Sequence, residues 1–372
     1  MDEVIISRTI DSAFPVRFAA DAFGEESNLA DILRESAGSD NPRVMIVADA
    51  NVVNHTDGLG MKIGRYLKSH SLELAAQPVV LGGGERMKCD AGRGAMRLVA
   101  MMLEAQIGKN DVVVAMGGGV LLDMAGYAAA QVRGGLNLVR MPTSTAAMVD
   151  ACFAEYAALN GKSVKDAIRV PSTPAAVVVD VTFAKTNLPK VYSAGFAEAI
   201  RIGAVQDGRL VKMIADRIDL VKEGDLRFLE KIVRRSAELR AANGQPQFAL
   251  WCAARLEAMS NYRLPHGYAI PIAICIDAAY SAEKEYLAET EQATICRTLY
   301  DIDALGGLHH SVHIVSNVDA LLGGLDGWRL SSGSEAIELP GAVGERIVES
   351  TPDRDAYAKV LRDLALAAAI DS

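Results

Sequence analysis

The sequence predicts an α/β N-terminal domain over residues 1–182, followed by an all-α C-terminal domain over residues 183–372. Three observations lead to this fold class. The 372 residues exceed what one hydrophobic core usually holds. In the first half, short apolar runs alternate with segments of helical periodicity, which is typical of a parallel sheet covered by helices. After about residue 183 the apolar runs stop and long helical patterns continue.

Five candidate strands lie in the first half. Each is a short run rich in Val, Ile or Leu, as expected for strands buried on both faces. They are residues 43–50, 77–83, 111–118, 136–142 and 176–181. Helical periodicity predicts helices over 91–108 and 119–134 between these strands, and over 225–243 in the second half. A further helical pattern begins near residue 248 and leads through a short connection to His266.

The composition argues against nucleic-acid binding and against a membrane protein. A net charge of −9 and a pI near 5.3 argue against nucleic acid or an anionic membrane as the main partner, since both are bound through excess Lys and Arg. No basic segment precedes an apolar one at the start, and no run approaches the roughly 18 apolar residues that span a bilayer. The five cysteines are odd in number and show no C-x-x-C spacing. We therefore expect a cytoplasmic protein with reduced thiols.

A glycine-rich turn is the first candidate for ligand binding. In 114-VAMGGGVLLDMAG-126, three glycines follow a predicted strand and open a predicted helix. Bare backbone N–H groups at the positive end of a helix suit a pyrophosphate. A tight turn with close helix packing explains the same glycines, so the turn by itself leaves both interpretations open.

Four further segments follow the order and spacing of the motifs of one protein family. They are 48-ADAN-51, 82-GGGERMK-88, 142-PTSTAAMVDA-151 and 195-GFAEAIRIG-203. Together with the glycine turn they resemble the sugar phosphate cyclase superfamily, whose best-known member is 3-dehydroquinate synthase. The resemblance runs over roughly residues 40–285, and 256-LEAMSNYRLPHG-267 is similar to a less-studied branch.

The resemblance implies a dehydroquinate synthase-like fold, in which a Rossmann-like NAD domain precedes a helical substrate and metal domain. It also implies a homodimer and a biosynthetic lyase. In this family NAD stays bound while a substrate hydroxyl is transiently oxidised, phosphate is eliminated and the opened chain closes by aldol addition. A metal ion held by one Glu and two His polarises the reacting oxygens.

The cofactor-binding positions that the resemblance implies are kept. Asp49 and Asn51 fall where the family holds the adenosine ribose, and Gly118, Gly119 and Val120 match the pyrophosphate turn. The remaining matches to cofactor contacts are Glu85, Lys88, Asp123, Thr143, Ser144, Phe183 and Thr186. We therefore expect NAD as the cofactor.

The positions that carry the family's chemistry are only partly kept. In 149-VDACFAEYAALN-160, Asp150 and Asn160 match the family pattern, but Tyr156 stands where the family has a lysine. Lys165 is the one residue retained from the pattern that follows. The loss of a lysine lowers the positive charge that is available to a phosphate.

Three further predicted catalytic residues are Glu198 and Arg201, in the segment that matches AE-x-x-K, and His266. Glu198 is retained, and Arg201 replaces the lysine. The guanidinium of arginine is a planar group, whereas the ammonium of lysine is a compact point charge. The predicted catalytic residues are Asp150, Asn160, Lys165, Glu198, Arg201 and His266.

Two histidines of the family pattern are absent. Leu250 stands where the related branch has a metal ligand, and Ala254 where it has a histidine on the phosphate side. Of the three metal ligands only Glu198 and His266 remain. Two ligands hold zinc poorly, since catalytic sites normally use three and a water. We therefore expect no zinc or cobalt site; if one is present, Glu198 and His266 hold it.

Replacement ligands are few. Cys252 lies about 200° around a helix from Leu250 and so faces the wrong way. The cluster 309-HHSVH-313 is interpreted as a solvated loop.

Three functions fit these residues. The first is a divergent sugar phosphate cyclase-like enzyme, a carbon–oxygen lyase that uses bound NAD on a polyhydroxylated or cyclitol-type substrate with less phosphate than usual, or none. In it Glu198 and His266 act as an acid–base pair in place of the metal, and Lys165 or Arg201 stabilises an enolate. The second is a non-catalytic relative that binds NAD or a metabolite and acts through a partner protein. The third is an NAD-dependent alcohol dehydrogenase. We favour the first.

Overall fold

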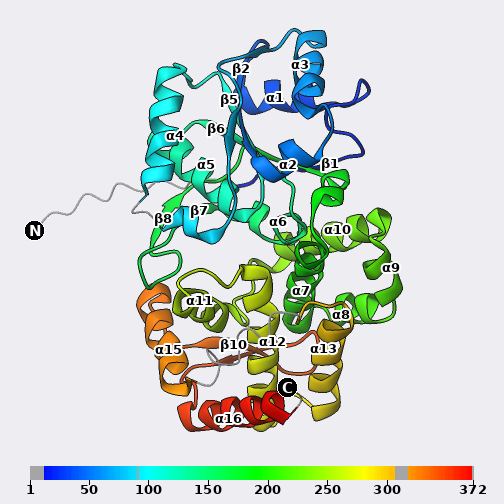
Figure 1. The fold of residues 1–372 in the computed structure, drawn as a ribbon, viewed down its shortest axis with the longest axis vertical. Coiled ribbons are helices and arrows are strands. Elements are labelled where there is room, and N and C mark those ends of the chain that lie inside the picture. Colours follow the sequence, from blue (N-terminus) through cyan, green and yellow to red (C-terminus); the bar gives the residue numbers. More distant parts are fainter. Residues whose placement is uncertain (1–11, 90–91, 306–316, 371–372) are drawn as a thin grey trace, which may run out of the picture.

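The computed structural model describes residues 12–89, 92–305 and 317–370. Along the longest axis of the molecule, a part built on a β-sheet lies above a part built mainly of helices (Figure 1). The predicted fold class, an α/β part followed by a helical part, is confirmed. The domain boundary at residue 182 stays a prediction.

A seven-stranded parallel sheet forms the centre of the first part. Its strands run in the order β1-β9-β6-β5-β2-β3, and β4 also pairs with β2. Every residue of β5 and β9 is buried, as expected for strands covered on both faces. The strands are β1 (Val16–Ala19), β2 (Arg43–Asp49), β3 (Glu73–Leu74), β4 (Val79–Leu81), β5 (Val112–Gly117), β6 (Asn137–Pro142) and β9 (Ala176–Asp180).

Helices connect these strands. The longest lie on the two faces of the sheet, with α4 and α5 on one side and α1 and α3 on the other (Figure 1). The helical segments of this part are α1 (Leu29–Ala37), α2 (Ala50–His55), α3 (Leu59–Ser69), η1 (Glu85–Lys88), α4 (Arg93–Glu104), α5 (Gly119–Gln131), α6 (Thr145–Val149), η2 (Ala151–Phe153) and η3 (Val181–Thr186). An antiparallel hairpin of β7 (Tyr156–Leu159) and β8 (Ile168–Pro171) lies beside α5.

The predicted strands are all present, as β2, β4, β5, β6 and β9, and the two predicted helices of this part are α4 and α5. The strands that the sequence did not predict, β1, β3, β7 and β8, are two to four residues long. A strand this short is recognised only where it forms part of a longer apolar run, as β4 does in residues 77–83.

The second part is helical, with one small hairpin that the prediction of an all-α domain did not include. The hairpin pairs β10 (Ile337–Pro340) with β11 (Arg346–Glu349). Its apolar residues Ile337 and Leu339 are buried against the helices. The helices are α7 (Pro189–Gln206), α8 (Gly208–Ala215), α9 (Ile218–Glu223), α10 (Leu226–Asn243), α11 (Leu250–Met259), α12 (His266–Glu283), α13 (Glu289–Asp301), α15 (Val318–Ser332) and α16 (Arg354–Ile370).

Helix α7 forms the centre of this part. Almost all of its residues after the first turn are buried, because α6, α8, α10 and α12 pack around it. A Cβ added at Gly195 would lie 2.5 Å from Thr145 Cβ, and one at Gly267 would lie 2.6 Å from Ala194 Cβ. These two glycines therefore let α6 and the first turn of α12 approach α7 closely. Within the described ranges, none of the helices has the length and apolar character needed to cross a bilayer.

Candidate active site

The centre of the candidate site is a contact between α7 and the first residue of α12. The Nε2 of His266 lies 2.7 Å from Oε1 of Glu198, although the two residues are 68 positions apart in the chain. Glu198 is buried, and the side chain of His266 remains about one-third exposed. Both were predicted as site residues, and the close packing at Gly267 brings them together.

The other ring nitrogen of His266 meets a second carboxylate. Its Nδ1 lies 2.7 Å from Oε1 of Glu257, a fully buried residue of α11. Lys165 donates to both carboxylate oxygens of Glu257, at 2.6 and 2.8 Å, and its Nζ is 3.1 Å from the same Nδ1. Glu257 was not predicted as a site residue; the signal for it was its place in 256-LEAMSNYRLPHG-267.

The two carboxylates keep His266 charged. Burial and the Lys165 ammonium lower the pKa of the imidazole, but Glu257 and Glu198 outweigh them and raise that pKa to about 9. Burial raises the pKa of Glu198, whereas Arg201 and His266 lower it, with a net pKa of about 2. At neutral pH the pair is therefore an imidazolium and a carboxylate.

Arg201 binds Glu198 from the opposite side to His266. Its Nε donates to Glu198 Oε2 at 2.7 Å, its Nη2 to Asp150 Oδ2 at 2.9 Å and its Nη1 to the carbonyl of Pro246 at 2.7 Å. The side chain is fully buried. A planar guanidinium makes three such contacts at once in a geometry that a lysine cannot reproduce.

A second buried cluster adjoins the first. Lys88 lies 2.6 Å from Asp123, 2.8 Å from Asp166 and 3.3 Å from Glu85. Asn160 donates to Glu85 at 3.0 Å and accepts from the backbone N–H of Asp166 at 2.9 Å. Glu85, Lys88 and Asp123 were predicted to contact the cofactor and Asn160 to be catalytic, whereas Asp166 was not predicted. The structure joins all five in one ion-pair network.

The glycine turn lies at the carboxyl end of the sheet. Gly118, Gly119 and Val120 are half-buried, and no side chain caps the N-terminus of α5. A Cβ on Gly118 would lie 3.2 Å from Ser144 Oγ, and one on Gly119 would lie 3.3 Å from Ala151 Cβ. The turn thus sits beside the residue that follows Asp150, and its bare helix end suits a pyrophosphate.

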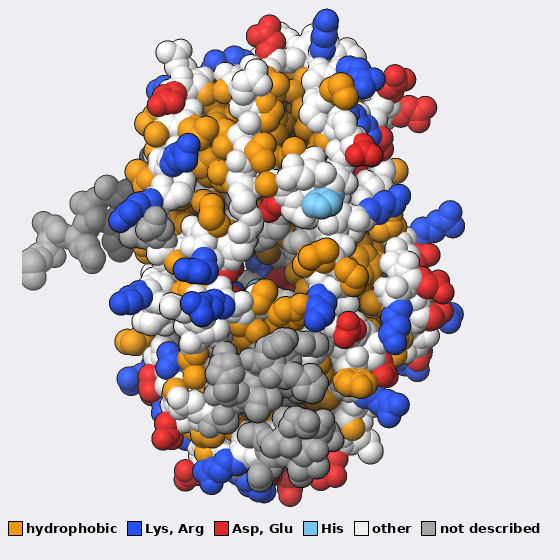
Figure 2. Space-filling model, in the orientation of Figure 1, with side chains coloured by type: hydrophobic (Ala, Val, Ile, Leu, Met, Phe, Trp, Pro, Cys, Tyr) orange, Lys and Arg blue, Asp and Glu red, His pale blue; other side chains and the backbone are white. Residues whose placement is uncertain are grey.

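The remaining predicted cofactor residues gather at the same end of the sheet. Asp49 caps α2 by accepting from the N–H of Asn51, and Asn51 donates to the carbonyl of Thr186 at 3.1 Å. Thr186 in turn donates to the carbonyl of Phe183. Ser144 caps α6, and Thr143 accepts through its carbonyl from Asn187. In parallel α/β sheets ligands bind at the carboxyl ends of the strands, which is where these residues lie. Figure 2 shows the surface hollowed between the two parts, with charged side chains at the bottom of the hollow.

The residues do not fit a three-ligand metal centre. Both oxygens of Glu198 already accept hydrogen bonds, one from Arg201 and one from His266, and Leu250 supplies no donor. Cys252 is fully buried in the hydrophobic core. No group of three or more His, Cys, Asp or Glu side chains is arranged to hold a metal ion in the part of the chain that the structure describes. The 309-HHSVH-313 cluster lies outside the described residues.

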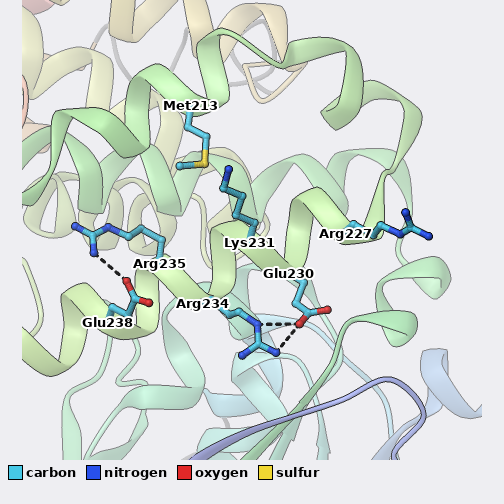
Figure 3. A pocket seen from close by; sticks show the side chains of 7 residues that line it. All are labelled: Met213, Arg227, Glu230, Lys231, Arg234, Arg235 and Glu238. Atoms are coloured by element: carbon cyan, nitrogen blue, oxygen red, sulfur yellow. Dashed lines mark hydrogen bonds and ion pairs between the residues drawn. The ribbon is translucent and has the colours of Figure 1, made fainter.

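Another surface hollow, of about 480 Å³, lies over α8 and α10 (Figure 3). Several of its charged side chains pair with each other along α10, with Arg234 2.6 Å from Glu230 and Arg235 2.9 Å from Glu238. Such pairs at a spacing of three or four residues are typical of a solvated helix face. The hollow contains none of the predicted site residues.

The start of α11 depends on a buried carboxyl group on α12. Asp277 accepts from the N–H of Ala249 and from Trp251 Nε1, both at 3.2 Å, and from the hydroxyl of Tyr357 at 2.9 Å. Ala249 has a left-handed backbone conformation with φ 65°. Burial raises the pKa of Asp277 to about 7, although the three hydrogen bonds lower it.

Because the pKa of Asp277 is raised, we expect the protein to lose stability as the pH rises. Because the pKa of Asp277 is higher in the folded than in the unfolded chain, its stabilising contribution is complete below pH 4 and is lost as the pH approaches 7. Between pH 5 and 6.5 we expect the free energy of unfolding to fall by up to about 1.4 kcal/mol per pH unit from this group. Urea unfolding of the wild type and of Asp277→Asn over that range measures it. Equal slopes for the two proteins would contradict the assignment.

Comparisons with known proteins support the class that the fold and site define, an NAD-type α/β domain joined to a helical domain. The family model described as 3-dehydroquinate synthase N-terminal matches residues 78–194. A 3-dehydroquinate synthase of Rhodopseudomonas palustris (strain BisB18) is 28% identical over 313 residues, which cover 78% of this chain and 81% of the relative.

Two solved structures share the fold. The 2-epi-5-epi-valiolone synthase from Streptomyces hygroscopicus subsp. jinggangensis 5008, with NAD⁺ and Zn²⁺ bound, superposes with a TM-score of 0.85 at 21% identity, over 98% of this chain and 100% of that one. A 2-deoxy-scyllo-inosose synthase complexed with carbaglucose-6-phosphate, NAD⁺ and Co²⁺ superposes with a TM-score of 0.77 at 16% identity, over 94% and 96%. These comparisons support the resemblance to the sugar phosphate cyclase superfamily, and the chain is similar to 3-dehydroquinate synthase.

Proposed function

We propose that this protein is a metal-independent, NAD-dependent lyase of the sugar phosphate cyclase type, acting on a polyhydroxylated substrate with little or no phosphate. The observation that carries the proposal is the 2.7 Å contact between Glu198 and His266, in a site connected to the glycine turn. The connection runs from Gly119 to Ala151, which follows Asp150, and from Asp150 through Arg201 to Glu198.

The glycine turn supports NAD as the cofactor. In the proposal Gly118, Gly119 and Val120 hold the pyrophosphate, and Asp49 and Asn51 hold the adenosine ribose at the end of β2. Both solved relatives named above have NAD⁺ bound. Bound NAD supplies reversible removal of a hydride from a substrate carbon, and the resulting ketone acidifies the neighbouring C–H.

The Glu198–His266 pair supplies the proton transfers. The Glu198 carboxylate takes the proton from the acidified carbon, and the carbon–oxygen bond to the leaving group breaks as a carbon–carbon double bond forms. The His266 imidazolium donates its proton to the departing oxygen. The 2.7 Å contact then returns the proton from Glu198 to His266, so that both groups recover their starting states. Lys165, beside His266, places a positive charge near the developing enolate.

The charge balance of the site supports a substrate with little phosphate. Lys88 contacts three carboxylates, Lys165 contacts Glu257, and Arg201 contacts Glu198 and Asp150. A phosphate dianion that binds one of these three cations must compete with a carboxylate that is already in place. Tyr156, where the family has a lysine, adds a hydroxyl and no charge. Ala254, in place of a histidine, lines with Lys165 a hollow of about 90 Å³.

A substrate panel tests the proposal. Purified protein with NAD is incubated with polyhydroxylated ketones and aldehydes, each with and without a phosphate group. Mass spectrometry follows the products and absorbance at about 340 nm follows NADH. We expect NAD to bind, a non-phosphorylated compound to lose water or to cyclise, and no net NADH to accumulate, because the hydride is returned to the substrate.

Each other outcome identifies a different function. Steady accumulation of NADH would indicate the alcohol dehydrogenase, and NAD binding without any turnover would support the non-catalytic relative. Turnover of the phosphorylated compounds alone would contradict the substrate class. The homodimer and the cytoplasmic location expected from the sequence stay predictions.

A further inference from the structure

We propose that Arg201 itself keeps this site free of divalent metal, in addition to the absence of a histidine at position 250. The proposal goes beyond the proposed function, because it concerns which residue excludes the ion and its test does not require turnover. It rests on the contacts of Arg201 with Glu198 and with the segment that precedes α11.

Arg201 occupies one of the two oxygens of the carboxylate that a metal would need. Its Nε donates a hydrogen bond to Glu198 Oε2 at 2.7 Å, and His266 Nε2 lies 2.7 Å from Glu198 Oε1. A metal bound by Glu198 Oε1 and His266 Nε2 would have to replace their 2.7 Å contact, while the Arg201 guanidinium stays on Oε2. His266 can turn its ring, since its side chain is about one-third exposed, but the Arg201 side chain is fully buried.

The guanidinium cannot withdraw, because its other two nitrogens are also bound. Nη2 donates to Asp150 at 2.9 Å and Nη1 to the Pro246 carbonyl at 2.7 Å. Moving the side chain away from Glu198 would leave Asp150 with only the more distant Arg240, at 3.7 Å, and would leave the buried Pro246 carbonyl without this donor, which costs free energy for each group. A fixed positive charge therefore stays beside Glu198 and repels a second cation placed there.

A lysine at position 201 would behave differently. Its ammonium is a single point on a flexible stem, so it can turn towards Asp150 and leave Glu198 Oε2 free. Helix α11 begins at Leu250, four residues after Pro246. The position of the missing histidine and the carbonyl that binds Arg201 Nη1 therefore belong to one short segment. Leu250→His alone adds a metal ligand but leaves the Arg201 guanidinium beside Glu198.

Four variants test the proposal: Leu250→His, Arg201→Lys, the double variant Leu250→His/Arg201→Lys, and Leu250→His/Arg240→Lys as a matched control. Arg240 is a second arginine near Asp150, at 3.7 Å, and it contributes no contact to Glu198. Each protein is incubated with zinc chloride, desalted and analysed for zinc per chain by mass spectrometry. Cobalt loading followed by visible absorption reports whether a tetrahedral site has formed.

We expect about one equivalent of zinc, with the cobalt spectrum of a tetrahedral site, in Leu250→His/Arg201→Lys alone. The wild type, both single variants and the Arg240 control should hold well below one equivalent. Stoichiometric zinc in Leu250→His or in the Arg240 control would overturn the proposal, and so would a folded Leu250→His/Arg201→Lys protein without zinc.

Circular dichroism and a cooperative unfolding transition establish that each variant is folded. If Arg201→Lys impairs folding, Arg201→Gln in the Leu250→His background removes the charge and keeps a hydrogen-bonding amide, and the same zinc content is expected. Failure of the proposed activity leaves this result unaffected, because zinc content is measured without substrate.

Discussion

Glu198→Gln and His266→Asn are each expected to lower turnover by about three orders of magnitude or more, while a chelator leaves the wild-type rate unchanged. General acid–base groups contribute roughly 10²- to 10⁴-fold each, and here the two groups act as one unit. Glutamine cannot accept the proton from carbon, and asparagine cannot exist as an imidazolium. Both replacements keep a polar group close in size, so NAD binding should persist.

Turnover of the substrate found with the panel, before and after dialysis against EDTA, measures this prediction. Glu230→Gln is the matched control, because Glu230 pairs with Arg234 on the outer face of α10, away from the site (Figure 3). Its rate should equal that of the wild type. A rate that falls on chelation and returns with zinc would reject metal-independent catalysis, and a wild-type rate for Glu198→Gln would reject the acid–base pair.

Arg140→Met is expected to lower the free energy of unfolding by about 4 kcal/mol or more. Arg140, on β6, is buried, and among the described residues its hydrogen-bond partners are backbone carbonyls and not carboxylates. Its Nη1 donates to the carbonyls of Cys152 and Ala154, and its Nη2 to those of Tyr156 and Ser172. These contacts hold the segment that follows Asp150 and carries Tyr156 against the sheet.

Methionine fills similar space but donates no hydrogen bond, so four carbonyls lose a partner, and the contacts to Cys152 and Ser172 are buried. Each buried acceptor left without a donor costs about 1–3 kcal/mol. Denaturant unfolding measures the change, and hydrogen exchange should show faster opening at residues 151–156. Arg209→Met is the control, because its side chain is 83% exposed and Asp207 keeps Arg235 as a partner. That change should cost less than about 1 kcal/mol, and an equally small cost for Arg140→Met would contradict the role.

The sheet, the glycine turn and the two absent histidines could be recognised in the sequence alone. Strands such as β5 are continuous apolar runs, and a residue buried on both faces of a sheet must be apolar whatever its neighbours are. The glycines of the turn are local as well, since they act on the backbone of their own segment. The missing histidines at Leu250, a metal-ligand position, and at Ala254, a phosphate-side position, were evident because the identity of a side chain is a property of a single residue.

Only the tertiary structure decided which charges pair with which. Lys165 meets Glu257 across 92 positions and His266 across 101, so no spacing along the chain could indicate that Lys165 pairs with them. Glu85, Lys88 and Asp123 were assigned to the cofactor by their motifs, yet in the structure they form one network with Asp166. The physical reason is that an ion pair depends on distances of a few ångströms, and those are set by how closely the helices approach. In this protein that approach is allowed by two positions without a side chain, Gly195 and Gly267.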